Sequence, residues 1–163
     1  MKISKTFIGI DPGVNGYIAK IISPTEVEID PIGDIFEWPW FEMNLLSDEV
    51  IIVAEKVQPR PNQGLKGVVT SCVNYGRLDA SMFWHELSPF WVTPQKWQRA
   101  MGLSRRWQRP KGLTDEQYSS WKYSERKKWH KREAKALFPA LKITLLNADA
   151  LLIAEYARRF YNK

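Results

Sequence analysis

Three acidic residues stand at the ends of separate apolar segments, and this pattern limits the possible folds more than any other feature of the sequence. Asp11 closes an apolar run that begins at residue 6, and Glu55 closes a second run that begins at residue 51. Asp149 lies at the start of the last apolar helical segment. A carboxylate beside a buried strand is costly unless a positive group compensates it. If the three carboxylates meet, they predict a site for one or two hard divalent cations, which take oxygen ligands.

Positive charge is concentrated in one region of the chain. The formal net charge is +6, and residues 96–135 hold 13 Lys and Arg against 4 Asp and Glu. The rest of the chain is therefore net negative. A concentrated basic region on such a body is typical of a nucleic-acid-binding protein. A solvated charged helix would give the same pattern.

Length and composition indicate a single globular domain spanning residues 1–163. Hydrophobic residues make up 44% of the chain, which argues against general disorder. The lone Cys72 excludes an intrachain disulfide, fits a reducing compartment and is expected in the core. Neither a signal peptide nor an apolar run long enough to span a membrane is expected. We therefore expect a cytoplasmic protein.

Apolar periodicity and turn residues divide the chain into strands followed by alternating helices and strands. The expected strands cover residues 4–10, 17–22, 25–32, 50–54 and 90–93, and the expected helices cover 65–84, 94–101, 125–137 and 148–161. In the first of these helices, the residues expected to share one broad apolar face are Leu65, Val69, Cys72, Leu78 and Phe83. Residues 102–126 are expected to form a polar, basic insertion. This order predicts an α/β or α+β domain with a mixed sheet.

Several motifs, taken in order, resemble the RuvC-type Holliday junction resolvases of the ribonuclease H-like superfamily, in particular their compact phage-encoded branch. The motifs lie at residues 7–13 with Gly16, 53–57, 74–77, 137–139 and 148–154, and the resemblance spans Ile8 to Tyr156. It implies an α/β, ribonuclease H-like fold, in which a five-stranded mixed sheet is flanked by helices. It also implies a metal-dependent endonuclease that cuts four-way DNA junctions symmetrically, working as a homodimer through the helix 65–84.

The resemblance assigns the metal ligands residue by residue. It implies that Asp11, Glu55 and Asp149 are catalytic and bind Mg²⁺ or Mn²⁺, with two cations in each active site. The family usually has a fourth acidic residue, or a nearby histidine, just before the final aspartate. Here the corresponding position is Leu146, and the neighbouring Asn147 is a candidate neutral oxygen ligand.

The basic region and the loop after Glu55 supply the candidate contacts to branched DNA. These candidates are Arg60, Lys66, Arg77, Arg105, Arg106, Lys127, Lys128, Lys131, Arg132 and Lys135. Three tryptophans, Trp107, Trp121 and Trp129, could stack on unpaired bases or belong to a core. The two histidines, His85 and His130, match no metal-binding spacing, so a zinc site is not expected.

Three other functions remain open at this stage. A nuclease of the same fold could act on flaps or other branched DNA, with the same catalytic residues. The missing fourth acid also fits a non-catalytic module that binds junctions. The loop at Asp11, Gly13 and Gly16 resembles the first phosphate loop of actin-like and hexokinase-like ATPases, but those proteins need a duplicated domain and a second such loop, which this chain lacks.

Overall fold

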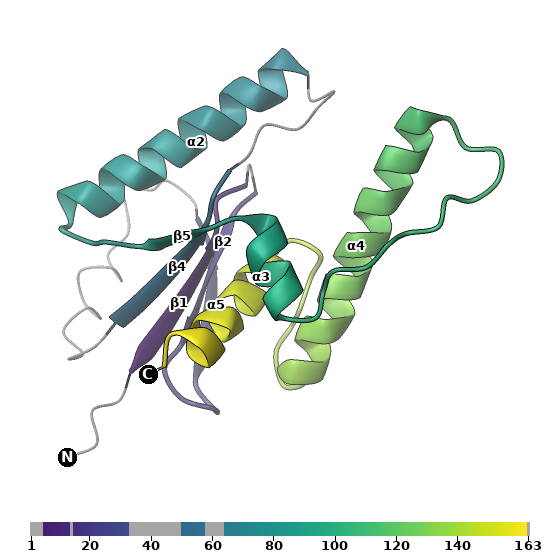
Figure 1. The fold of residues 1–163 in the computed structure, drawn as a ribbon. Coiled ribbons are helices and arrows are strands. Elements are labelled where there is room, and N and C mark those ends of the chain that lie inside the picture. The colour runs from purple at the N-terminus through teal and green to yellow at the C-terminus, as the bar shows by residue number, and fades with distance from the viewer. Residues whose placement is uncertain (1–4, 14, 33–49, 58–63, 163) are drawn as a thin grey trace.

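The computed structural model describes residues 5–13, 15–32, 50–57 and 64–162 and shows a mixed sheet with helices on both faces (Figure 1). The strands are β1 (Thr6–Asp11), β2 (Tyr17–Ile21), β3 (Val27–Pro31), β4 (Val50–Glu55) and β5 (Phe90–Val92). Their order in the five-stranded sheet is β3-β2-β1-β4-β5. The first three strands pair antiparallel, whereas β4 and β5 run parallel to β1. The predicted α/β fold with a five-stranded mixed sheet is confirmed.

Four helices complete the described fold: α2 (Leu65–Trp84), α3 (Pro94–Ala100), α4 (Asp115–Leu137) and α5 (Ala148–Phe160). No helix in the described part of the chain is both long enough and apolar enough to cross a membrane. The prediction of α3 is confirmed, since Thr93 caps it by accepting a hydrogen bond from the Lys96 backbone and Pro94 occupies its first turn.

Helix α4 begins at Asp115, well before the residue 125 predicted from the sequence. A capping box fixes this start. The Thr114 hydroxyl accepts from the Gln117 backbone N–H (3.3 Å), and the Gln117 side chain accepts from the Thr114 backbone N–H (2.9 Å). The second half of the expected insertion, residues 102–126, is therefore the first half of a long helix.

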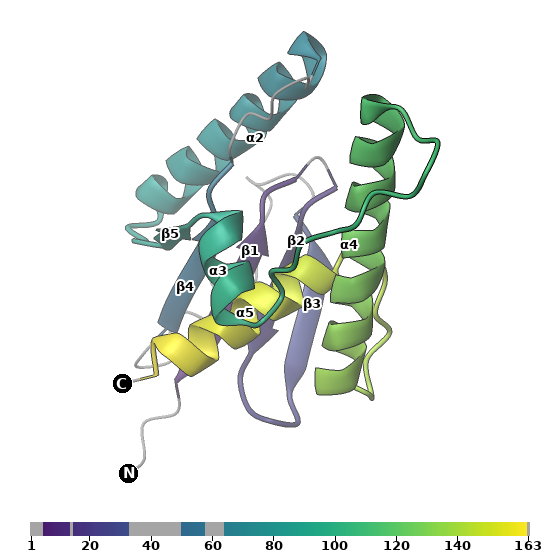
Figure 2. The same cartoon turned by 45° about the vertical axis from the view of Figure 1, so that its right-hand side comes forward.

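Alternation along the strands divides the core between the two faces of the sheet. On one face, Phe7 and Val53 belong to a buried cluster with α5. On the other face, Ile8 and Ile52 belong to a second cluster with the C-terminal half of α2. Because successive side chains of a strand point to opposite faces, α5 and α2 cover opposite sides of the same sheet, as Figure 2 shows.

Gly9 permits the close contact between β1 and α5. A Cβ atom at this position would overlap the backbone of Ala150 and Ala154 and lie 2.7 Å from Ala154 Cα. No side chain fits there, so the helix backbone rests directly on the strand. This contact sets the height of α5 above the sheet, and with it the position of Asp149 in the first turn of the helix.

Helix α2 has the predicted bounds, but Leu78 does not share a face with the other four apolar residues, and the core position expected for Cys72 is wrong. Its buried residues are Leu78, Ser81 and Met82. Leu65, Val69 and Phe83 are exposed, and Cys72, which was expected in the core, is also exposed. Leu78 and Met82 lie one turn apart on the face of α2 that packs against the sheet. The exposed residues lie on a different face of the helix: Leu65, Val69, Cys72 and Phe83.

Candidate active site

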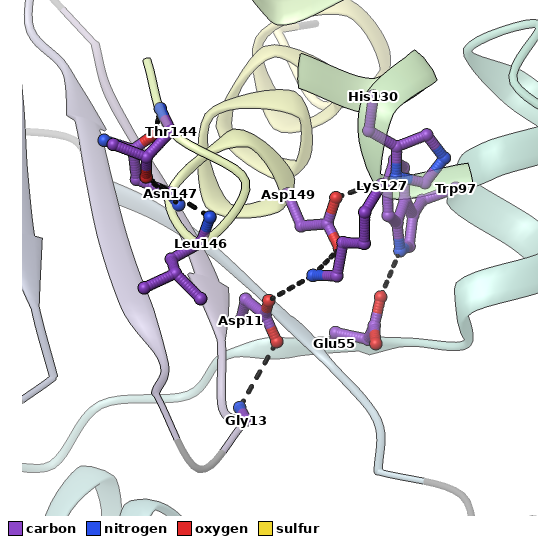
Figure 3. Close-up of polar contacts among 10 residues, drawn as sticks. All are labelled: Asp11, Gly13, Glu55, Trp97, Lys127, His130, Thr144, Leu146, Asn147 and Asp149. Atoms are coloured by element: carbon purple, nitrogen blue, oxygen red, sulfur yellow. Dashed lines mark hydrogen bonds and ion pairs between the residues drawn. The ribbon is translucent and has the colours of Figure 1, made fainter. Parts of the chain in front are cut away.

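The three carboxylates predicted to meet do come together at one edge of the sheet. Asp11 is the last residue of β1 and Glu55 is the last residue of β4. These strands are parallel neighbours, so their carboxyl ends lie at the same edge. The first turn of α5 brings Asp149 over that edge, and Figure 3 shows the three side chains facing one another.

The loop after β1 orients Asp11. The Gly13 backbone N–H donates to Asp11 Oδ1 at 3.2 Å. Gly16 closes the loop, because a Cβ atom there would overlap the carbonyl oxygen of Asp11 and lie 2.9 Å from Gly13 O. The packing of this turn is therefore enough to explain the glycine at position 16.

Asp149 is buried, and two residues of α4 use both of its carboxylate oxygens. His130 Nδ1 lies 2.7 Å from Oδ1, and Lys127 Nζ donates to Oδ2 at 2.6 Å. Burial alone would raise the pKa of Asp149, but the hydrogen bond to His130 and the charge of Lys127 outweigh it and lower the pKa to about 2. Asp149 is therefore ionised at neutral pH.

Lys127 lies between two of the three carboxylates. Its Nζ atom is 3.7 Å from Asp11 Oδ2 in addition to its contact with Asp149, and its side chain is only 15% exposed. Burial would lower the pKa of Lys127, but the charges of Asp149 and Asp11 raise it to about 12. The ammonium group is thus a permanent positive charge inside the acidic cluster.

Glu55 is held from the other side by Trp97, a fully buried residue of α3. The indole Nε1 donates to Glu55 Oε2 at 2.6 Å. Burial, together with the negative charges of Asp11 and Asp149, raises the pKa of Glu55 to about 8. Burial and the charge of Asp149 also raise the pKa of Asp11. The site therefore has more negative charge than its own lysine neutralises.

This excess of negative charge is what a divalent cation would relieve, and the carboxylate oxygens are the ligands that Mg²⁺ and Mn²⁺ prefer. Asp11, Glu55 and Asp149 are thus suited in kind to hold such an ion. In the described ranges, however, no three acidic, histidine or cysteine side chains lie as close together as metal ligands would. Protein donors occupy each carboxylate, so the side chains would have to shift when an ion binds.

Asn147, the candidate neutral ligand, is engaged within its own turn. Its Oδ1 accepts from the Thr144 backbone N–H at 2.8 Å, and its Nδ2 donates to Lys142 O at 3.2 Å. Leu146, at the position of the missing fourth acid, is exposed. The residue that contacts the final aspartate is instead His130, from a different helix (Figure 3).

Sequence reasoning gave no role to His130 or to Trp97. His130 is fully buried, and its Nε2 has no hydrogen-bond partner among the described residues. The signal in the sequence was its spacing of three residues from Lys127, which puts both side chains on one face of α4. For Trp97 the sequence carries no comparable signal, because its contact with Glu55 joins residues far apart in the chain.

The candidate DNA-contacting residues fall into separate groups. Arg60 lies outside the described residues. Lys127 contacts the carboxylates, and Lys135 donates to the carbonyls of Pro139 and Leu141 beyond the end of α4. The exposed candidates are Lys66 and Arg77 on α2, Arg105 and Arg106 in the segment before α4, and Lys128, Lys131 and Arg132 on α4.

The three tryptophans pack on one another. Trp107 makes edge contacts with Trp121 and Trp129, each at a ring-centroid distance of 6.0 Å. Arg105 lies over the Trp107 ring at 3.8 Å. The Tyr118 hydroxyl donates to Trp107 O at 2.8 Å. This cluster fastens the segment before α4 to the helix, so the tryptophans have a structural role in the free protein.

Comparison with known proteins reveals a likeness of fold only. No family model matches the chain, and no curated protein matches it by sequence. Among solved structures it is similar to T. thermophilus RuvC in complex with a Holliday junction substrate, with a TM-score of 0.55. The two are 14% identical, and the match covers 95% of each chain. The chain therefore has the ribonuclease H-like fold of RuvC.

Proposed function

We propose that this protein is a metal-dependent, structure-specific endonuclease that hydrolyses phosphodiester bonds in four-way DNA junctions. The observation that supports this proposal most directly is the meeting of Asp11, Glu55 and Asp149 at one sheet edge. The fold that brings them together is similar to that of a resolvase solved with a Holliday junction. On the resemblance of the sequence motifs alone, we also propose that the protein is phage-encoded and acts in the bacterial cytoplasm.

The chemistry requires oxygen ligands on rigid elements. Bound Mg²⁺ or Mn²⁺ would activate the attacking water and stabilise the charge that develops at the phosphate. Asp11 and Glu55 are presented by adjacent central strands, and Asp149 by a helix that rests on β1. His130 holds one oxygen of Asp149 and so fixes the rotation of its carboxylate. We propose these three carboxylates as the metal ligands.

Exposed basic residues beside the site would hold the DNA backbone. We propose that the cations of α4 and the preceding segment contact phosphates, since Lys131 and Arg106 are exposed there. Such contacts give an affinity that falls steeply with salt and carry little sequence information. They suit an enzyme that recognises the shape of a branch point.

We further propose that the protein acts as a homodimer joined through α2. Leu65, Val69 and Val73 recur every four residues and are 80%, 51% and 46% exposed, so they form an apolar stripe on the outside of the helix. A second copy of the chain would cover this stripe in a two-fold interface. The four-way junction has matching symmetry, so each subunit would cut one of two opposed strands.

Strand cleavage of a synthetic four-way junction, in Mg²⁺ and separately in Mn²⁺, tests the proposal. Linear duplex, a three-way junction and a flap serve as competitors. We expect paired, symmetric nicks in the four-way junction. Preferential cutting of flaps would support the alternative branched-DNA nuclease. Binding without nicks in either metal would indicate a non-catalytic junction-binding module.

Conservative variants test the assignment of the three carboxylates. Asp11→Asn, Glu55→Gln and Asp149→Asn should each lower the cleavage rate by at least about 100-fold, because each removes a charged ligand, while junction binding stays largely intact. Asp79→Asn, at an exposed position on α2, is the matched control. Near wild-type cleavage by any of the three variants would remove that residue from the ligand set.

A further inference from the structure

Lys127 and the next residue, Lys128, use their charges in different ways. The side chain of Lys128 is 62% exposed and pairs with Glu125 on the outside of α4. The side chain of Lys127 is largely buried and turns into the acidic cluster, where its ammonium group contacts Asp149 and Asp11 (Figure 3). A lysine that served only to hold DNA phosphates would have no reason to be placed there.

We propose that Lys127 is a built-in cation of the site, and that its ammonium group takes the place of a second divalent ion in the free protein. The proposal rests on the metal-dependent function proposed above and changes one part of it. The family resemblance implies two cations per site, whereas Lys127 leaves room and charge for only one until DNA adds further negative charge.

Charge balance supports a single ion. The site carries three carboxylates, Asp11, Glu55 and Asp149, and one ammonium group, so its formal charge with all groups ionised is −2. One divalent cation would neutralise this charge. A second would leave a net charge of +2 in a buried site, twice the charge that two ions would leave without the lysine, and this is unfavourable without a further anion.

The position of the ammonium group supports the same conclusion. Lys127 Nζ lies 2.6 Å from Asp149 Oδ2 and 3.7 Å from Asp11 Oδ2, so it joins the carboxylates of two different elements. These are oxygens that an ion shared by Asp11 and Asp149 would also need. An ion arriving there would meet a positive charge that water and salt screen only weakly, because the charge is buried.

The surroundings hold Lys127 in this position. One turn further along α4, the fully buried His130 bonds to Asp149, and its ring lies 5.5 Å from that of Trp97. The next turn contributes Ala134 to the core cluster that includes α5. The helix is therefore fixed to α5 close to Lys127, and the short lysine–carboxylate distance is a consequence of packing.

The number of Mn²⁺ ions bound in the absence of DNA tests the proposal. During titration of the protein with Mn²⁺, electron paramagnetic resonance measures the free ions, and the bound ions follow by difference. We expect the wild-type protein to bind about one ion per chain and Lys127→Met to bind about two, because the variant has an extra unit of negative charge and an emptied position.

Two further variants control this experiment. Lys127→Arg keeps the positive charge and should still bind about one ion. Lys128→Met makes the same change in charge at the exposed neighbouring position and should also bind about one ion. Circular dichroism establishes that each variant is folded before ions are counted. If Lys127→Met does not fold, Lys127→Gln is used in its place.

The outcomes separate this inference from the proposed function. Two tightly bound ions in the wild-type protein would overturn the role of Lys127 and leave the nuclease proposal standing. An unchanged count in the folded Lys127→Met or Lys127→Gln variant would do the same. If the wild-type protein bound no Mn²⁺ and cut no junction, the metal-dependent function would fail, and the inference with it.

Discussion

Helices α5 and α2 cover opposite faces of one sheet, but they are held in very different ways. Residues 148–157 of α5 are all buried, because the helix has β1 on one side and packs against α4 and α3 elsewhere. In α2, Leu78, Ser81 and Met82 are buried, while apolar residues of the earlier turns are exposed to solvent. One helix is enclosed by its own chain, and the other is only half covered.

The difference follows what each helix has to do in the proposed function. Helix α5 carries Asp149, and a metal ligand needs a fixed position relative to Asp11 and Glu55. Direct contact of its backbone with Gly9 provides that position. Helix α2 carries none of the three carboxylates, and its exposed apolar stripe is free to meet a second copy of the chain.

The largest effect is expected from a substitution that separates α5 from the sheet. Gly9→Ala should destabilise the protein by about 3 kcal/mol or more, because the added Cβ would meet helix backbone, which cannot move aside as a flexible side chain would. Urea unfolding measures the loss. Wild-type stability of the Gly9→Ala variant would mean that the helix does not rest on β1 as described.

A smaller effect is expected from the charge that this packing concentrates. Burial and the neighbouring carboxylates raise the pKa of Glu55 from its ordinary value of 4.5 to about 8. For a group with a raised pKa, the stabilising contribution is present at low pH and is lost as pH rises through the folded-state value. Without metal, the wild-type protein should therefore lose stability between pH 5 and pH 8.5 from this group.

Glu55→Gln should remove that loss, because glutamine does not ionise. The variant should gain on the order of 2 kcal/mol relative to wild type between the two pH values, as measured by urea unfolding in a chelator. Glu26→Gln, in an exposed turn, is the control and should follow the wild-type protein. If the stability of wild type and of Glu55→Gln changed with pH in parallel, the raised pKa of Glu55 would be contradicted.

The same glycine-to-alanine change should have the opposite sign on α2. A Cβ at Gly76 would meet nothing within 4 Å, so Gly76→Ala should stabilise the protein by about 0.5–1 kcal/mol through helix propensity alone. The midpoint of thermal unfolding provides the measurement. A loss of stability would show that α2 is packed as closely as α5 at this point.

The smallest change in stability is expected at the exposed stripe, where association should change instead. Val69→Asp should alter the free energy of unfolding of the monomer by less than about 0.5 kcal/mol. It should nevertheless convert the proposed dimer to a monomer, because it puts a charge into an apolar interface. Light scattering after size-exclusion chromatography measures the mass, with Ser119→Asp on the exposed side of α4 as the control. An unchanged dimer would place the interface elsewhere.

Local patterns in the sequence were sufficient for most of the secondary structure. Apolar runs with turn residues between them predicted the strands, and Pro94 predicted the start of α3. The start of α4 was predicted too late, although Thr114 and Gln117 have the spacing of a capping box. The capping box is the local signal for the true start of the helix, and the charge pattern of residues 102–126 does not reveal it.

The core position expected for Cys72 on α2 is wrong for a different reason. Val69 and Cys72 fit an apolar helical face, and periodicity alone predicts that such a face is covered. Which face of α2 is covered depends on how the helix is rotated on the sheet, and this is a property of the whole fold. The sequence of α2 does not contain that information.

The sequence by itself determined the mixed sheet and the placement of three carboxylates, two at strand ends and one at the start of the last helix. Both depend on the local order of apolar and acidic residues. Only the tertiary structure showed what surrounds those carboxylates. His130 and Lys127 reach Asp149 from α4, and Trp97 reaches Glu55 from α3. These contacts join residues that are distant in the chain, so they exist only once the helices have packed against the sheet.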